Sequence, residues 1–252
     1  MNRKQMRPWG RLAHHKQTAT RIDAEPQLQA YLQNSGLAIG FGRSYGDSGV
    51  AQSGKAWAIS ELNDIESFDP QTGRLVCAAG VSLGEILNRT LTQGWSLPVS
   101  PGTQFVSVAG AIANDVHGKN HHRTGTFGRH VLNFELLRSS GEKLLCSPTQ
   151  NTDWYGATIG GLGLTGVITK AEIQLTQAPS AHLNVVVKPY QNLVEFFALG
   201  NELNDDYDYT VAWFDCAAKG DSLGRGIYYV ANPAGAESGF EQAKRWSISV
   251  PI

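Results

Sequence analysis

Excess charge of either sign and long apolar runs are both missing from this sequence. It has 21 Lys and Arg residues against 22 Asp and Glu, a formal net charge of -1. A near-neutral chain gains little from phosphate backbones or anionic bilayers, so binding to nucleic acid is not expected. The sequence has no run of about 18 apolar residues, so no membrane-spanning helix is predicted. The basic stretch Met1–Arg11 is not followed by the apolar segment of a secretory signal. We expect a soluble, globular protein.

Cysteine is scarce as well. The three residues, Cys77, Cys146 and Cys216, are odd in number, widely spaced and without a CxxC pair. This pattern suggests neither a disulfide framework nor a zinc site. Reduced thiols fit it best, which favours the cytoplasm as the location.

Glycine, in contrast, is abundant, with 28 residues that fall largely into three patches. Between the patches, hydrophobic periodicity predicts regular elements. Helices are expected at Ala24–Ser35, at Glu85–Gln93 with Ser82 as cap and Gly94 as stop, and at Asn192–Asn204. Strands are expected at Leu37–Ile39, Ala56–Ser60, Leu75–Ala79, Val131–Arg138, Glu142–Cys146, Val167–Leu175, His182–Lys188, Thr210–Asp215 and Gly226–Val230, with Pro70–Gly73 as the turn between the second and third. Val108–Val116 fits either a tightly packed helix or a loop.

The first glycine patch, Gly40–Ser48, directly follows an apolar strand. Its three glycines allow positive φ or a close approach of the backbone to a ligand. Exposed amides in such a turn form a nest for a diphosphate, and Arg43 and Ser44 can add donors to the same anion. A glycine-rich hairpin without a ligand explains this patch equally well.

The second patch begins with Ser100–Thr103 and continues from Ser107 to His122. Small side chains come first and would let a flat ring lie against the backbone. A dense polar run, His117–His122, follows, and it favours a polar active-site floor. His117 and His121 stand four residues apart and could share a helix face with a metal, but Gly118 and the lack of a third ligand argue against a metal site.

The third patch, Gly161–Gly166, formally matches the dinucleotide fingerprint G-x-G-x-x-G. That motif requires a strand before it and a helix after it. Here Trp154–Thr158 is not strand-like, and Val167–Leu175 alternates like a strand, so we reject a Rossmann fold. No G-x-x-x-x-G-K-[ST] phosphate loop occurs either.

The three patches together, in this order and spacing, resemble the FAD-binding domain of the vanillyl-alcohol-oxidase, or PCMH, family. The run His117–His122 resembles the branch of that family that oxidises polyprenylphosphoryl-ribose. The resemblance covers Arg7–Thr176. It implies an α+β fold in which a PCMH-type FAD-binding domain of two α/β subdomains, residues 1–178, precedes the start of a mixed-sheet substrate domain, residues 179–252. A shift of composition after Pro179 places the boundary.

The resemblance also implies a set of site residues. The FAD contacts would come from Gly40, Phe41, Gly42, Arg43, Ser44, Tyr45, Gly46, Asp47, Pro101, Gly102, Thr103, Ser107, Val108, Ala109, Gly110, Asn114, Asp115, Val116, His117, Gly163, Gly166 and Ile168. The substrate would face Lys119, Asn120, His121 and His122. His117 is the candidate base, because histidine exchanges protons near neutral pH, and Lys119 would hold a phosphate or a sugar hydroxyl.

Several members of the family bind flavin covalently through a histidine in the first loop. Tyr45, Gly46 and Asp47 occupy that stretch here, so we expect noncovalent FAD. The expected reaction passes a hydride from an alcohol carbon to the flavin while a base takes the hydroxyl proton. Its substrate would be a sugar or a lipid-linked sugar, the latter bringing the protein into contact with a membrane. The sequence does not indicate which electron acceptor reoxidises the flavin.

Family members run beyond 400 residues by resemblance, so residues 181–252 would form only the opening of the substrate domain. One alternative is therefore a flavin-binding half that needs a partner protein to supply the missing C-terminal half. A second is the related reductase of cell-wall nucleotide-sugar synthesis, against which the His117–His122 run speaks. A glycine-rich α/β domain without flavin would need three loops in the right order by coincidence.

Overall fold

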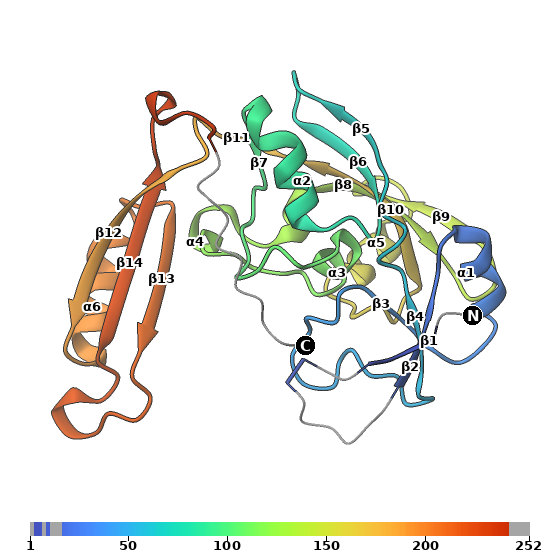
Figure 1. The fold of residues 1–252 in the computed structure, drawn as a ribbon, viewed down its shortest axis with the longest axis horizontal. Helices are drawn as coiled ribbons and strands as arrows, with labels where there is room; N and C mark the ends of the chain where they lie inside the picture. The colour runs from blue at the N-terminus through green and yellow to red at the C-terminus, as the bar shows by residue number, and fades with distance from the viewer. Residues whose placement is uncertain (1–2, 7–8, 11–16, 242–252) are drawn as a thin grey trace. The chain divides into compact units, whose positions relative to one another are not determined.

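The computed structural model describes residues 3–6, 9–10 and 17–241 of the chain (Figure 1). Its contacts group these residues into two compact units. Unit 1 comprises the described residues up to Thr90 together with Ser96–Thr176, and unit 2 comprises Leu91–Trp95 and the described residues from Gln177 onward. Within these described ranges, no helix has the length and apolar character that crossing a bilayer requires.

A four-stranded sheet in unit 1 has the order β1-β2-β4-β3. Its strands are β1 (Arg3–Met6), β2 (Gln17–Arg21), β4 (Lys55–Ala58) and β3 (Leu37–Ile39). β1 and β2 are antiparallel, whereas β4 lies parallel to both β2 and β3. Helix α1 (Glu25–Tyr31) follows β2 and buries Leu28, as the helical spacing predicted. The first glycine patch leaves this sheet at the end of β3.

An antiparallel five-stranded sheet in the same unit has the order β5-β6-β10-β8-β9. Its strands are β5 (Ile65–Asp69), β6 (Arg74–Ala78), β10 (Val167–Gln174), β8 (Val131–Leu137) and β9 (Lys143–Cys146). Ala171 and Ile173 of the central strand β10 are buried, while Lys170 and Glu172 between them are partly exposed. The alternation predicted for this strand is therefore confirmed.

The solvent side of this sheet carries an ion-pair group around Lys170. Its Nζ lies 2.7 Å from a carboxylate oxygen of Glu66 and 3.7 Å from one of Glu135. The hydrogen bond with Glu66 is the largest of the effects that raise the pKa of Lys170. The charges explain why one face of a central strand stays polar.

Three strands of these two sheets, β1, β2 and β5, were missed and one turn was misassigned in the sequence-based prediction. Pro70–Gly73 joins β5 to β6, and not the strand at Ala56–Ser60 to β6. Strand β5 was missed because its residues are exposed or only partly buried and its sequence has few β-branched side chains. The hairpin of β8 and β9 was predicted correctly.

The helices of unit 1 are short, and the longest has a capping box. α2 (Leu83–Thr90) begins after Ser82, whose N donates to Glu85 Oε2 (2.7 Å) while its Oγ accepts from Glu85 N (3.1 Å). The 3₁₀ turn η1 (Leu91–Gln93) continues it, and Gly94 stops it with a φ of 81°. The remaining helices of the unit are α3 (Val108–Ala113), α4 (His121–Thr124), η2 (Phe127–His130) and α5 (Thr152–Thr158).

Unit 2 is built on an antiparallel sheet of order β12-β14-β13, with helix α6 on one face (Figure 1). The elements are β12 (Leu183–Tyr190), α6 (Leu193–Leu203), β13 (Tyr209–Phe214) and β14 (Gly226–Pro233), with the 3₁₀ turns η3 (Gly220–Ser222) and η4 (Ala236–Ser238). Tyr190, Leu203, Tyr228 and Val230 form the core beneath the helix. The short strands β7 (Trp95–Ser96) and β11 (Thr176–Gln177) pair with each other in a separate two-stranded sheet.

The sheet face of unit 2 that points away from α6 is apolar and uncovered. Val187, Tyr229 and Val211 stand in register across it. Val185 and Val187 are exposed, and the side chain of Trp213 is 62% exposed. An apolar patch of this kind usually marks a surface that another segment or molecule covers.

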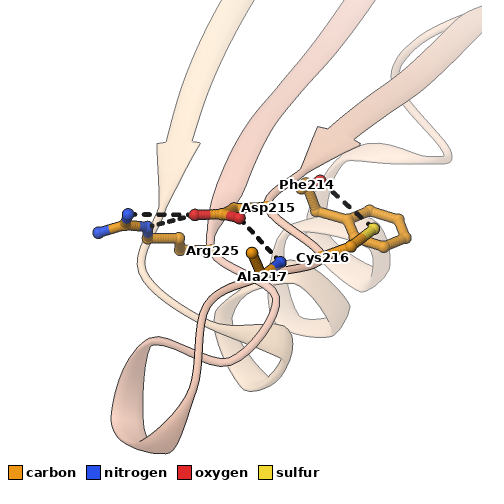
Figure 2. Close-up of polar contacts among 5 residues, drawn as sticks. All are labelled: Phe214, Asp215, Cys216, Ala217 and Arg225. Atoms are coloured by element: carbon orange, nitrogen blue, oxygen red, sulfur yellow. Dashed lines mark hydrogen bonds and ion pairs between the residues drawn. The ribbon is translucent and has the colours of Figure 1, made fainter.

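The loop between β13 and β14 is held by a carboxylate, as Figure 2 shows. Asp215 Oδ2 lies 3.1 Å from Arg225 Nη2, and Asp215 Oδ1 accepts a hydrogen bond from Ala217 N (2.9 Å). The bond from the Ala217 amide, followed by the one from Arg225, lowers the pKa of Asp215. The ion pair thus bridges the two ends of the loop, where it leaves β13 and enters β14.

The three cysteines are free thiols in different surroundings. Cys77 and Cys146 are buried, and burial raises the pKa of Cys77 to about 12. Cys216 is exposed beside the Asp215 loop (Figure 2). The predicted absence of a disulfide framework agrees with these thiols.

Candidate functional site

A cavity in unit 1 is lined by all three glycine patches. The cavity opens to solvent, and its empty space, with the open solvent at its mouth included, is about 710 Å³. The lining residues are Leu37, Ala38, Ile39, Gly40, Gly42, Ser44, Ser48, Gly49, Ile59, Ser107, Ala109, Gly110, Ala113, Asn114, Thr158, Leu162, Gly163, Gly166, Val167 and Ile168.

The first patch forms a loop that is seated directly on the second. Gly42 and Gly46 have φ angles of 66° and 63°, in the left-handed region that favours glycine. Gly40 lies so close to Ser107 that a Cβ at this position would overlap the Ser107 hydroxyl. A side chain at Gly40 would therefore push the loop away from helix α3.

Gln17, at the start of β2, fixes the far end of this loop. Its side chain is buried, with Nε2 donating to Gly49 O (2.7 Å) and Oε1 accepting from Ala51 N (3.0 Å). The side-chain nitrogen and oxygen of Gln17 thus both form hydrogen bonds with the backbone at the end of the loop. Sequence reasoning missed this residue because a lone glutamine carries no motif.

The second patch supplies helix α3, which packs against the central strand β10. Ser107 caps the helix by accepting a hydrogen bond from Gly110 N (3.2 Å) at its Oγ. Asn114 ends the helix, and its Nδ2 donates to Gly110 O (2.8 Å). Of the two interpretations of Val108–Val116, the helix is therefore correct up to Ala113.

The third patch closes the carboxyl end of α3. Gly160 N donates to Ile112 O (3.0 Å) and Leu162 N to Ala113 O (2.8 Å), which satisfies two carbonyls at the helix end. The patch follows helix α5 and precedes strand β10. The rejection of a Rossmann motif is confirmed, because the order of elements around the glycines is reversed.

The lining combines apolar side chains with small hydroxyl groups. Ile39, Ile59 and Ile168 are among the apolar residues, and Ser44, Ser48 and Ser107 carry hydroxyls. None of the described residues that line the cavity carries a charge. Such a lining can take a flat ring against its apolar residues and polar groups against its hydroxyls, so the residues present fit a flavin nucleotide.

The polar run after α3 is anchored to the segment that precedes the second patch. Lys119 N donates to Ser100 O (3.1 Å), and a Cβ at Gly118 would stand 2.6 Å from Ser100 N. Asn120 is only 4% exposed, and its Nδ2 donates to Pro98 O (2.7 Å). Asn120 thus has a buried anchoring position instead of an open one.

Three histidines of this run lie close together. The ring centroids of His117 and His121 are 5.7 Å apart, and those of His121 and His122 are 5.8 Å apart. His117 and Lys119 are exposed, and His117 forms an isolated bridge with Thr126. Within the part of the chain that the structure describes, no group of three or more His, Cys, Asp or Glu residues could hold a metal ion.

The structure brings part of the predicted cofactor set together at the cavity. Ten of those residues line it: Gly40, Gly42, Ser44, Ser107, Ala109, Gly110, Asn114, Gly163, Gly166 and Ile168. The others do not belong to the lining: Phe41, Arg43, Tyr45, Gly46, Asp47, Pro101, Gly102, Thr103, Val108, Asp115, Val116 and His117. Val108 is buried in the core. Asp115, whose own φ is 41°, accepts a hydrogen bond from Gly128 N (2.8 Å) at its Oδ1.

Other lining residues were not predicted, notably Leu37, Ile39, Ile59 and Thr158. Leu37 and Ile39 belong to β3, and Thr158 ends α5, where its hydroxyl lies 2.8 Å from that of Thr165. The strand before a glycine-rich loop could have been included on the ground that its last residues point toward the same ligand. Thr158 offered no such signal.

Comparison with known proteins gives matches to flavoproteins. Residues 30–147 match the family model described as an FAD binding domain. Decaprenylphosphoryl-beta-D-ribose oxidase of Mycolicibacterium smegmatis is 41% identical over 193 residues, which cover 75% of this chain and 42% of that protein. A cytokinin dehydrogenase 3 of Oryza sativa subsp. japonica is 28% identical over 185 residues, 68% of this chain and 35% of the relative.

A putative D-arabinono-1,4-lactone oxidase of Neurospora crassa is 26% identical over 164 residues, 64% of this chain and 29% of the relative. The chain spans less than half the length of each of these relatives. The matched region includes the first two glycine patches and the polar run that follows them.

Proposed function

Because this chain belongs to the FAD-binding oxidoreductases of the vanillyl-alcohol-oxidase, or PCMH, type, we propose that it binds FAD noncovalently in the glycine-lined cavity and serves the oxidation of a sugar CH–OH group. The cavity is the observation that carries the proposal, since it unites three segments that are far apart in the sequence. FAD, when bound, accepts the hydride taken from the alcohol carbon.

The protein's own residues would hold the cofactor without a covalent bond. Gly40 packs closely on Ser107 and the third patch is hydrogen-bonded to the end of α3, so backbone would lie close to the ligand. The serine hydroxyls of the lining can donate to phosphate or ribityl oxygens. Tyr45, in the stretch where several family members carry a flavin-linked histidine, cannot form that link. It is exposed and lies beside the cavity lining instead.

We place the substrate next to the polar run that follows α3. His117, the candidate base, is exposed and can take the hydroxyl proton of an alcohol. Lys119 is exposed on a backbone fixed to Ser100, so it can hold a phosphate or a hydroxyl at a defined place. His121 and His122 would add donors around them, whereas the buried Asn120 would act by anchoring the run.

The substrate class is a polyprenylphosphoryl-ribose-like sugar, or an alditol or aldonolactone. The Mycolicibacterium relative is a decaprenylphosphoryl-ribose oxidase and the Neurospora relative a putative arabinonolactone oxidase. A lipid-linked substrate would bring the protein into contact with a membrane, and we propose the cytoplasm as its compartment. The relatives are named as oxidases and a dehydrogenase, which does not favour the alternative of a noncatalytic flavin-binding half.

We further propose that unit 1 is the FAD-binding domain, with its two sheets as the two subdomains, and that unit 2 belongs to a substrate domain. The uncovered apolar sheet face of unit 2 supports this assignment, because a face bearing Val187 and Trp213 calls for a covering surface.

The test is the absorption spectrum of the purified chain, taken before and after denaturation and filtration. We expect a flavin band that passes through the filter, and turnover of a sugar alcohol with a dye as electron acceptor. A band that stays with the protein would refute noncovalent binding. A chain that remains colourless after incubation with FAD would refute the cofactor site, and bound FAD without turnover would favour the noncatalytic alternative.

A further inference from the structure

Arg43, whose chain neighbours line the cavity, lies close to two aromatic rings. Its guanidinium carbon is 4.7 Å from the ring centroid of Trp9 and 5.9 Å from that of Phe105. Both distances lie within the range of cation–π attraction, about 6 Å. Trp9 is 51% and Phe105 52% exposed, so neither ring is held there by burial in the core.

The position of Arg43 in the first loop is the second observation. Its chain neighbours Gly42 and Ser44 both line the cavity, while its own side chain does not. Among the described residues, no carboxylate forms a salt bridge with Arg43. The cavity lining has no charge of its own, so Arg43 is a cation directly beside a neutral site.

Phe105 is a firm platform because the backbone on both sides of it is tied to helix α2. Gly84 N donates to Gln104 O (3.1 Å) and Leu83 N to Val106 O (2.9 Å). Phe105 N itself donates to Thr103 Oγ1 (3.2 Å). Trp9 comes from the connection between β1 and β2, and Gln17 of β2 anchors the loop that carries Arg43.

We infer that Trp9 and Phe105 are positioning residues, which hold Arg43 as the cation for the diphosphate of a dinucleotide bound beside Ser44. This inference rests on the proposed FAD site. The two rings restrict the long Arg43 side chain before a ligand arrives, so less rotamer freedom is lost on binding. The stack also compensates Arg43 for the carboxylate that it lacks.

If the rings act by holding Arg43, they should strengthen the binding of anionic ligands only. A diphosphate gains from the held cation, whereas riboflavin has no phosphate and should gain nothing. If the rings only stabilised the fold, their removal would weaken both ligands alike and would act independently of Arg43. Ligand choice and coupling to Arg43 therefore separate a positioning role from a structural one.

The experiment measures the affinity of the chain, freed of bound flavin, for FAD, ADP and riboflavin by calorimetry. Trp9→Ala and Phe105→Ala should each weaken FAD and ADP about two- to fivefold, the equivalent of an exposed cation–π pair. Arg43→Ala should weaken them on the order of tenfold. Trp9→Ala should add nothing in the Arg43→Ala background, and Trp9→Phe should restore affinity.

A matched control exists in the same unit. Arg138 stands 3.7 Å from the ring centroid of Trp154, outside the cavity lining. Arg138→Ala removes a cation–π pair of the same kind and should leave all three affinities unchanged. Thermal melts of the ligand-free variants show whether each one folds, and Phe105→Ala carries the test should Trp9→Ala unfold.

The possible outcomes distinguish the inference from the proposed function. A chain that binds no FAD at all would overturn the proposed site, and the inference with it. FAD binding that survives Trp9→Ala and Phe105→Ala at full strength would overturn the inference alone. Additive losses in the Trp9→Ala/Arg43→Ala pair, or an equal loss of riboflavin, would do the same by showing a structural role.

Discussion

Gly40 shows, at the scale of single residues, how the cavity depends on side chains that are absent. Its neighbour across the site is Ser107, whose Oγ and Cβ occupy the space that a Cβ on Gly40 would need. Gly40→Ala should therefore displace the first loop and lower the free energy of unfolding by about 1–3 kcal/mol, the usual cost of overpacking. FAD affinity should fall with it, which calorimetry and chemical denaturation would measure together.

The control for this substitution is Gly156→Ala, in the middle of helix α5. A Cβ at Gly156 meets no atom within 4 Å, and alanine favours a helix over glycine by roughly 1 kcal/mol. Unchanged FAD binding with equal or higher stability is expected there. If the Gly40→Ala protein were as stable, and bound FAD as tightly, as its Gly156→Ala counterpart, the close contact of Gly40 with Ser107 would not be what positions the first loop.

At this scale the sequence predicts glycine positions better than side-chain roles. Gly40 and Gly42, both in the predicted cofactor set, line the cavity, because a glycine patch after a strand reports on the backbone itself. Asn120 has a buried anchoring position that no motif could indicate, since polarity in a sequence does not reveal which polar groups are spent on nearby carbonyls. Gln17 was missed for the same reason.

Among the elements, those with a period or a capping motif were predicted correctly. Strand β10 shows its alternation because one face is covered and the other carries Lys170 and Glu172. Strand β5 was missed because it carries no such contrast. The third glycine patch was assigned correctly only because the neighbouring elements were weighed against the motif, and their order is helix, glycines, strand.

The loop between β13 and β14 permits a prediction about pH. Hydrogen bonds from Ala217 N and Arg225 lower the pKa of Asp215 below its ordinary value of 3.8. A carboxylate with a lowered folded-state pKa stabilises the fold above its unfolded-state value and loses that effect as pH falls through the folded value. Asp215→Asn should therefore destabilise unit 2 at pH 6, and the difference from wild type should shrink below about pH 4.

Thermal melts across this pH range would measure the effect, with Asp221→Asn as the matched control. Asp221 lies in the same connection and is exposed, so its substitution changes the charge equally. It should leave the melting temperature nearly unchanged at every pH. A deficit of Asp215→Asn that persists undiminished in acid would show that the carboxylate's charge is not what holds the loop.

The molecule as a whole consists of two units whose relation to the cofactor should differ. Every residue that lines the cavity belongs to unit 1. Unit 2 has a separate core around Tyr190 and Tyr228, and an apolar sheet face that bears Trp213. The sequence predicted a change of composition after Pro179, but it could not reveal that Leu91–Trp95 groups with the second unit, since that depends on contacts between distant segments.

Ligand binding stabilises only the structure that forms the site, by about 2.7 kcal/mol when the ligand is at 100 times its dissociation constant. FAD at that excess should slow hydrogen exchange in unit 1, most strongly in Leu37–Gly49 and Ser107–Asn114, and leave β12, β13 and β14 unchanged. Mass spectrometry of peptides from the exchanged protein would measure this, with a chain saturated with ADP as the comparison. Slower exchange in unit 2 alone, or equally in both units, would contradict the assignment of the cofactor site to unit 1. Protection by FAD that exceeds protection by ADP along Ile39, Ile59 and Ile168 would locate the flavin ring at the apolar residues of the lining.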